Sequence, residues 1–160
     1  MTRVDDVQAV VFGLDAEVFA LSVEVVREIL DHRPAFRMPH APEWLAGLID
    51  VRGDAIPVVD LNVRLGRAPT AVTPTTRILV VDAVAGERRL TLGLIVSRVL
   101  EVCAFTPDEI EAAPEIGGHW RSDYVGGVTR RGGAFVVHLD LARIFAGDAD
   151  ALNGDLRDAA

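Results

Sequence analysis

The chain has 160 residues, of which half are hydrophobic and a quarter charged, with a formal net charge of −8. This length suits one domain or two small subdomains that share a core, and the composition is that of a folded globule rather than a disordered chain. The negative charge argues against nucleic-acid binding, which depends on clustered positive charge to neutralise phosphates.

The N-terminal segment and the apolar runs predict a cytoplasmic protein. Asp5 and Asp6 stand where a signal peptide needs basic residues followed by an uninterrupted apolar run. No apolar run approaches the ~20 residues of a membrane-spanning helix. The single cysteine, Cys103, lies in the apolar run VLEVCAF, so it forms no internal disulfide and we expect a small buried hydrophobe.

The first residues of the chain predict strands joined by tight turns. Residues 10–14 are apolar and β-branched, and an acidic turn at 15–17 follows them, so this region predicts a hairpin. Ser22 can cap a short turn over residues 23–26. We expect this turn to run directly into the next strand.

A proline and a set of glycines organise the following stretch. Residues 41–45 read APEWL, which places a proline where a helix can begin, and Gly47 would end this brief helical link. The sequence LIDVRGDAIPVV then predicts strands at residues 48–51 and 55–59 around a glycine turn. Pro57 indicates an edge position or a bulge, because proline donates no backbone hydrogen bond.

Two short capped helices are predicted at matching places, one in each half of the chain. Each has an aspartate at the N-cap, two inward apolar residues and a terminal glycine. The two sets are Asp60, Leu61, Leu65 and Gly66, and Asp140, Leu141, Phe145 and Gly147. Residues 67–76 are rich in proline and threonine and predict an exposed connection between the halves. Residues 148–160 predict an acidic, flexible tail.

An internal duplication relates the two halves. Residues 47–65 align with residues 126–145 when one inserted residue is allowed, and residues 9–30 correspond loosely to residues 77–102. The aligned pairs are Gly47/Gly126, Arg52/Arg131, Gly53/Gly132, Asp60/Asp140, Leu61/Leu141 and Leu65/Phe145. Duplicated units of short strands with brief capped helices predict a mainly β fold of two small β-barrels packed together.

Signals of catalysis are absent from the sequence. The chain contains no lysine, which excludes a P-loop lysine and Schiff-base chemistry. It has no G-x-S-x-G elbow, and its four histidines show no metal-ligand spacing. A small hydrolase would need a converged nucleophile and base, and an OB-like nucleic-acid module would need basic and aromatic stacking surfaces. We therefore predict no enzyme, no cofactor and no metal.

Four motifs, taken in order, resemble the CheW family, the coupling proteins of bacterial chemotaxis, over about residues 8–147. They read AVVFGLDAEVFALSVEVVREIL, GLIDVRGDAIPVVDL, LTLGLIVSRVLEV, and SDYVGGV followed by VVHLDLARIF. Each motif is weak alone, but their order is specific. The resemblance implies a CheW-like domain over residues 7–147, with two intertwined five-stranded barrels of SH3-like or OB-like shape and no catalysis.

The same resemblance implies a role and partners. Members of the family are adaptors that couple the cytoplasmic signalling tips of chemoreceptors to the regulatory domain of a CheA-type histidine kinase, and they reach membrane receptor arrays through these partners. Related coupling proteins also serve gliding or type IV pilus chemosensory pathways, which is the alternative assignment. An OB-like nucleic-acid-binding module is the less favoured one.

The motifs also carry over a receptor-binding groove between the two barrels. Its implied residues are Val26, Glu28, Asp50, Arg52, Gly53 and Val99. Without the resemblance, Arg52 reads as a solvated hairpin arginine, a view that the aligned Arg131 supports, and the two valines read as core. Asp50 stands where the family signature has asparagine, so it could alter receptor choice or hold Arg52 in a local ion pair. The tripeptide Arg52-Gly53-Asp54 matches a cell-adhesion signal, but we interpret it as a hairpin turn.

Overall fold

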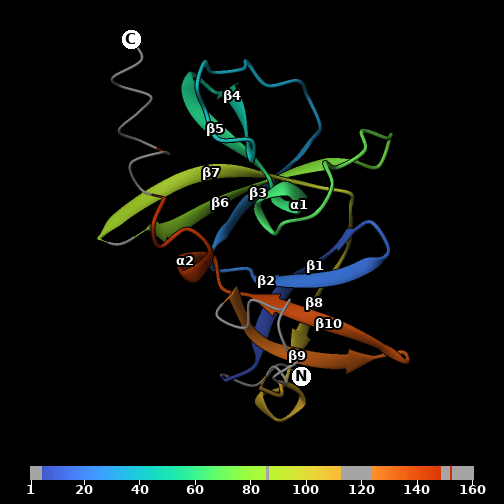
Figure 1. Ribbon diagram of the computed structural model, residues 1–160. Coiled ribbons are helices and arrows are strands. Elements are labelled where there is room, and N and C mark those ends of the chain that lie inside the picture. Colours follow the sequence, from blue (N-terminus) through green and yellow to red (C-terminus); the bar gives the residue numbers. More distant parts are fainter. Residues whose placement is uncertain (1–4, 86, 113–123, 149–151, 153–160) are drawn as a thin grey trace.

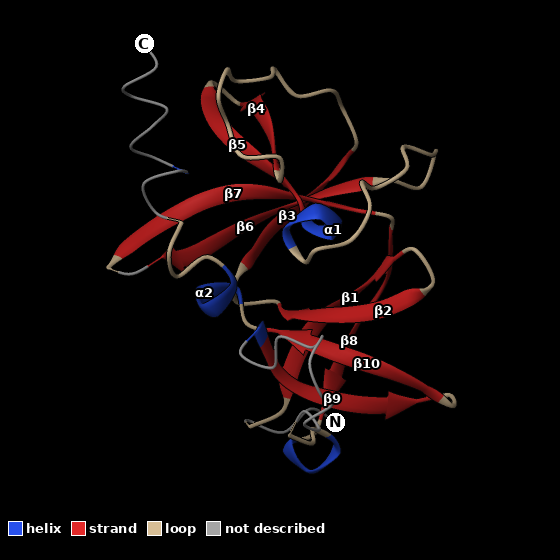
Figure 2. Ribbon diagram, viewed as in Figure 1, coloured by secondary structure: helices blue, strands red, loops and turns tan. Residues whose placement is uncertain are grey.

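A computed structural model describes residues 5–85, 87–112, 124–148 and 152 of the chain. In these ranges it has ten strands, two short α-helices and one turn of 3-10 helix, so the fold is mainly β as predicted (Figure 2). The elements are β1 (Val7–Leu14), β2 (Glu17–Ser22), β3 (Val26–Asp31), β4 (Leu45–Val51), β5 (Asp54–Asp60), α1 (Leu61–Arg64), β6 (Arg77–Ala85), β7 (Arg88–Val96), β8 (Arg98–Phe105), η1 (Pro107–Glu109), β9 (Val125–Arg131), β10 (Ala134–Leu139) and α2 (Leu141–Ile144). None of these helices is long and apolar enough to cross a membrane.

The strands form two five-stranded sheets that face each other, with α1 and α2 between them (Figure 1). Sheet A has the order β8-β1-β2-β10-β9, and sheet B has the order β3-β6-β7-β5-β4. Each sheet contains one parallel pair, β10 on β2 in sheet A and β5 on β7 in sheet B. The expected division into two five-stranded units is confirmed.

The strand orders show how the duplicated halves interlock. When each strand of sheet A is replaced by the strand five places away in chain order, β1 by β6 and β8 by β3, the order becomes that of sheet B. Each half therefore gives its first two strands to one sheet and its last three strands to the other. This exchange is the intertwining that the resemblance implied.

The two sheets are not closed barrels, and in this detail the prediction was wrong. In the described part of the chain, no ladder joins β8 to β9 or β3 to β4. A single isolated bridge spans each gap, Glu111 to Val128 in sheet A and Phe36 to Leu48 in sheet B. Gly47 lies next to the bridge of sheet B. It allows the close approach of Phe36, because a side chain at residue 47 would collide with the carbonyl oxygen of Phe36. At each gap the two chain segments therefore pair at one bridge and do not form a continuous ladder.

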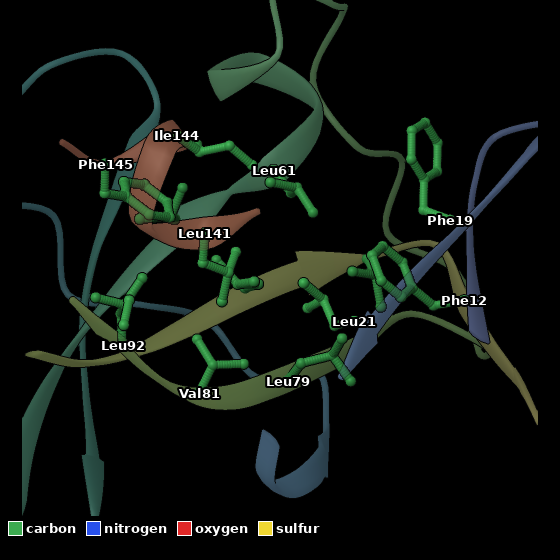
Figure 3. Packing of buried hydrophobic residues seen from close by; sticks show 14 of the residues in the cluster. Phe12, Phe19, Leu21, Leu61, Leu79, Val81, Leu92, Leu141, Ile144 and Phe145 are labelled. Atoms are coloured by element: carbon green, nitrogen blue, oxygen red, sulfur yellow. The ribbon is translucent and has the colours of Figure 1, made fainter. Parts of the chain in front are cut away.

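Large apolar side chains between the sheets form the main core (Figure 3). The labelled ones come from β1, β2, β6, β7, both α-helices and the residue after α2, and they are Phe12, Phe19, Leu21, Leu61, Leu79, Val81, Leu92, Leu141, Ile144 and Phe145. Burying each such side chain contributes about 1.5–3 kcal/mol. Each sheet also has an inner cluster of its own. Inner cluster B contains Ile49, Val51, Ile56, Val58, Ile78, Val80 and Ile95, and inner cluster A contains Ala9, Val11, Ala20, Phe105 and Val136, with Cys103 half-buried beside it.

The hydrogen-bond register identifies which residues of the two sheets correspond. In both sheets a bulge interrupts the pairing at the same place, so β4 and β5 correspond to β9 and β10 with a shift of 80 residues throughout, as from Gly47 to Gly127. Arg52 therefore corresponds to Gly132, and Arg131 corresponds to Val51. The predicted pairings Gly47/Gly126, Arg52/Arg131 and Gly53/Gly132 are wrong by one residue, because no residue is inserted.

The predicted helical link at residues 41–45 is a hydrogen-bonded turn. The N–H of Leu45 donates to the carbonyl oxygen of Pro42 at 3.0 Å, and β4 begins at Leu45. Gly47 lies inside β4, at its bulge, instead of ending a helix. Pairing with β5 outweighs the local helix signal of the proline. Pro57 itself lies one residue before β5 begins to pair with β7, where its missing N–H costs nothing.

The two predicted aspartate caps differ. Asp140 caps α2 by accepting a hydrogen bond from the N–H of Arg143 at 3.2 Å. Asp60 stands at the N-cap of α1, but its carboxylate accepts from the backbone N–H and the hydroxyl of Thr70, at 3.0 and 2.7 Å. The cap predicted for Asp60 is therefore wrong, because the chain after α1 folds back over it.

The domain bounds 7–147 and the tail from residue 148 stay predictions. Most of residues 148–160 lie outside the described part of the chain. Two that are described are packed against the domain. Asp148 forms an ion pair with Arg64 at 2.7 Å, and Leu152 is 2% exposed in the main core.

Candidate functional site

The β4–β5 hairpin carries three of the predicted site residues on a two-residue turn. Arg52 and Gly53 connect the paired residues Val51 and Asp54, with φ angles of 52° and 90°. Two successive positive φ angles define a type I′ turn, whose twist matches the flanking strands. The carboxylate of Asp50 accepts a hydrogen bond from the N–H of Gly53 at 2.7 Å. Asp50 therefore braces the turn.

Arg52 pairs with Glu28 of β3 and not with Asp50, which corrects the local ion pair considered from sequence. Its Nη1 donates to Oε1 of Glu28 at 3.1 Å, and its Nη2 donates to Oε2. A bidentate arginine–carboxylate pair fixes the orientation of both groups. Because β3 and β4 are the two edges of sheet B, this pair bridges the gap where the sheet stays open.

The electrostatics of the pair follow from its geometry. The guanidinium of Arg52, mainly through its hydrogen bonds, holds the pKa of the Glu28 carboxyl below its ordinary value. The same contact raises the pKa of Arg52. The Arg52 side chain is 72% exposed, so water screens the pair and its contribution to stability is small. What the pair provides is a rigid, charged and accessible surface.

Val26 and Val99 occupy corresponding places in the two sheets. Val26 pairs with Val81 beside the bulge of β3, and Val99 pairs with Phe12 beside the bulge that β8 forms against β1. Both are partly buried and pack on the main core. The structure thus brings Glu28, Asp50, Arg52 and Gly53 together, with Val26 on the same strand as Glu28, while Val99 belongs to the other sheet. Whether the two valines line a groove stays a prediction.

Arg64 is a central residue that the sequence analysis missed. Its guanidinium lies 5.5 Å from the ring centroids of both Trp44 and Tyr124 and 5.8 Å from that of Phe145. It also pairs with Asp148 and donates to the hydroxyl of Tyr124 at 3.2 Å. These contacts join α1 of the first half to α2 of the second. Trp44 and Tyr124 are separated by the same shift of 80 residues, which was the available sequence signal.

The described residues offer no catalytic constellation. No group of three or more His, Cys, Asp or Glu side chains among them is placed to hold a metal ion. A cavity of about 540 Å³ opens beside β2, β9 and β10, and its lining is mostly apolar, with Val18, Val128, Phe135 and Val137. A smaller cavity of about 270 Å³ lies beside α2, between the two sheets. The structure is that of a duplicated β scaffold that carries an exposed arginine–glutamate pair at the open side of one sheet.

The comparisons with known proteins agree with this class. The family model described as CheW-like domain matches residues 8–149. The chain is 30% identical over 141 residues to the probable chemotaxis protein CheW of Rhizobium etli, covering 88% of each chain. It is 30% identical over 138 residues to the chemotaxis protein CheW of Rhizobium meliloti, covering 86% of each. The crystal structure of the scaffolding protein TtCheW from Thermoanaerobacter tengcongensis is similar, with a TM-score of 0.77 and 28% identity over 88% of both chains. The chain belongs to the CheW family of non-catalytic chemotaxis coupling proteins.

Proposed function

We propose that this protein links the cytoplasmic signalling tips of chemoreceptors to the regulatory domain of a CheA-type histidine kinase, in the cytoplasm at membrane receptor arrays. We propose further that the receptor contacts the Glu28–Arg52 surface. This surface consists of Glu28, Asp50, Arg52 and Gly53, bordered by Val26 and Val99. Support for the role comes from relatives named chemotaxis proteins and from the likeness to a scaffolding protein.

The observation that carries the placement is the arginine at the turn. Arg52 adopts a φ of 52°, a left-handed conformation that favours glycine over residues with a side chain. Its counterpart in sheet A, Gly132, makes the same turn at a φ of 56°. The turn itself therefore does not require arginine at this position, and the exposed pair with Glu28 adds little to stability. The explanation for Arg52 lies in its side chain, which is exposed, charged and held by Glu28.

The test replaces Arg52 by the residue that the other sheet uses. Arg52→Gly should leave thermal unfolding unchanged or slightly improved, because it relieves the left-handed strain. Co-sedimentation with receptor signalling-tip fragments should weaken about tenfold, the effect of losing about 1.4 kcal/mol. Arg52→Glu should weaken it further by repelling Glu28. Arg88→Glu, a charge reversal at the exposed start of β7, is the matched control and should bind normally.

The outcomes separate the site from the function. If the Arg52 variants bind receptor fragments as the parent protein does, the surface is misplaced, although the adaptor role stands. If the parent protein binds neither receptor fragments nor the kinase regulatory domain, the proposed function fails. A double variant, Glu28→Arg with Arg52→Glu, exchanges the two charges of the pair. It should recover binding only if the receptor recognises the geometry of the pair more than the position of the positive charge.

A further inference from the structure

The connector, residues 65–76, covers one side of the junction between the two sheets. Its Thr70 is held by the carboxylate of Asp60 and also accepts a hydrogen bond from the side chain of Asn62 at 2.9 Å. Its Arg67 donates to the carbonyl oxygen of Leu14 at 3.3 Å and lies 3.5 Å from the carboxylate of Asp15. The connector thus bridges α1 and the end of β1.

The corresponding residues on the other side of the junction line an open cavity. The register gives one shift for each part of the sheet. Each residue of β5 and α1 corresponds to the residue 80 positions later, as Asp60 does to Asp140. Each residue of β1 corresponds to the residue 69 positions later, as Val11 does to Val80. The four residues that the connector contacts correspond to Asp140, Ala142, Ala83 and Val84. All four line the cavity of about 270 Å³ beside α2.

The part of the chain that the structure describes contains one connector of this kind, and the sequence of residues 148–160 differs from it in chemistry. The residue 80 positions after Thr70 is Asp150, and residues 148–160 contain no serine or threonine. An acidic side chain is a poor ligand for the carboxylate of Asp140, because like charges that approach closely repel. The cavity therefore calls for a segment with different chemistry.

We propose that this cavity is a docking site for an extended segment of a partner protein. The segment presents a serine or threonine whose backbone N–H and hydroxyl both donate to the carboxylate of Asp140, as those of Thr70 donate to Asp60. The Asp140 carboxylate is partly exposed, and among the residues that the structure describes it bonds only Arg143 of its own helix. Asp82 lies on the same wall, where its carboxylate pairs with Arg27 at 3.6 Å and accepts a hydrogen bond from Thr91. The cavity adjoins the Glu28–Arg52 surface, because Val25 lines it and Val26 borders that surface, but the inference rests on Asp140 and not on the receptor contact.

A peptide with the sequence of the connector is a suitable probe. The peptide GRAPTAVTPT, residues 66–75 capped at both ends, is added to the full-length ¹⁵N-labelled chain. Saturable shifts are expected at the amides of Ala83, Gly126 and Ala142. Valine in place of the fifth peptide residue, the threonine, should weaken binding about tenfold, because a charge-assisted hydrogen bond is lost.

Two variants of the protein test the mechanism without relying on one another. Asp140→Ser keeps an N-cap for α2 but removes the carboxylate, and binding should weaken about tenfold or more. Ala142→Phe, at an exposed position of α2, should block the cavity sterically and leave the cap intact. Asp108→Ser, an exposed acid in η1, is the matched control and should bind like the parent.

Three results would overturn the inference. One is the absence of pocket shifts at millimolar peptide. Another is full binding by Asp140→Ser and Ala142→Phe. The third is a set of nuclear Overhauser contacts, in the free protein, between residues after Leu152 and Ala142, because these would show that the chain's own tail fills the cavity.

Discussion

The residues around the two inner clusters differ in chemistry although the strands of the two sheets have the same order. Inner cluster B is wholly aliphatic, with isoleucine and valine at its core positions. In sheet A the residues that correspond to Ile49, Val51 and Val58 are Thr129, Arg131 and His138. One topology therefore supports both an apolar and a partly polar interior, provided that each polar group finds a partner.

Sheet A meets this condition with a small network around Phe105. Nε2 of His138 and the hydroxyl of Thr129 lie 2.7 Å apart, and the imidazole packs edge-on to the Phe105 ring at 4.8 Å. The guanidinium of Arg131 lies 4.2 Å from the centroid of the same ring and donates to the carbonyl oxygen of Ala104 at 2.8 Å. The network replaces the aliphatic contacts of sheet B with directional ones.

The polar interior makes sheet A sensitive to pH. Burial, and secondly the charge of Arg131, lower the pKa of His138 below its ordinary value of 6.5. The unfolded chain therefore takes up a proton at this residue before the folded one does. The contribution of His138 to the free energy of unfolding is therefore largest above pH 6.5. It is lost as the pH falls through 6.5 toward the lowered pKa of the folded state. Inner cluster B contains no titratable side chain and adds no such dependence.

The largest predicted change in the free energy of unfolding comes from replacing a residue of inner cluster B by its counterpart in sheet A. Ile78 is fully buried, and its counterpart is Ala9. Ile78→Ala should lower the free energy of unfolding by about 2–5 kcal/mol, because it leaves a cavity in an aliphatic cluster. Urea denaturation at pH 7 measures this. A loss below about 1 kcal/mol would mean that inner cluster B closes around the missing side chain.

A smaller effect is expected from removing the arginine of sheet A. Arg131→Leu loses the contact with Phe105 and the hydrogen bond to Ala104, so the free energy of unfolding should fall by about 1–2 kcal/mol. Arg130→Leu, on the neighbouring exposed position of β9, serves as the control and should change it by less. Equal losses in both variants would show that the network around Phe105 adds nothing.

The smallest change in stability at pH 7 is expected from converting the interior of sheet A to that of sheet B. The double variant Thr129→Ile with His138→Val copies Ile49 and Val58 and should alter the free energy of unfolding by about 1 kcal/mol in either direction. Its diagnostic result is the pH profile, in which the decrease between pH 7 and pH 5 should become shallower. An unchanged profile would assign the pH dependence to groups other than His138.

The strands and hairpins could be predicted because their signals are local. Alternating apolar residues and short acidic or glycine turns define β1, β2, β6 and β7 without reference to the rest of the chain. The proline at residue 42 is equally local, but there strand pairing prevailed. The exchange of strands between sheets came only from the family resemblance, because no local pattern specifies which half a strand joins.

The candidate site was predicted less completely than the fold. The motif identified Arg52, yet its partner Glu28 is 24 residues away, while Asp50 offered a nearer and misleading one. The alignment of Arg52 with Arg131 failed for a related reason. Identical residues favoured an insertion, whereas the bulges of β4 and β9 show that the hydrogen-bond register has none. Register is a property of paired strands, so one strand's sequence does not contain it.

The exchange of strands also dictates when each sheet can assemble as the ribosome makes the chain. The strands of sheet B lie together in the sequence, from Val26 to Val96, so this sheet can pair as soon as that segment emerges. Sheet A must wait, because β1 and β2 are made first and β9 and β10 nearly last. At ordinary translation rates the N-terminal hairpin is without its partners for on the order of ten seconds. During nascent growth, the exposed apolar face of this hairpin is the surface for which a chaperone would be needed.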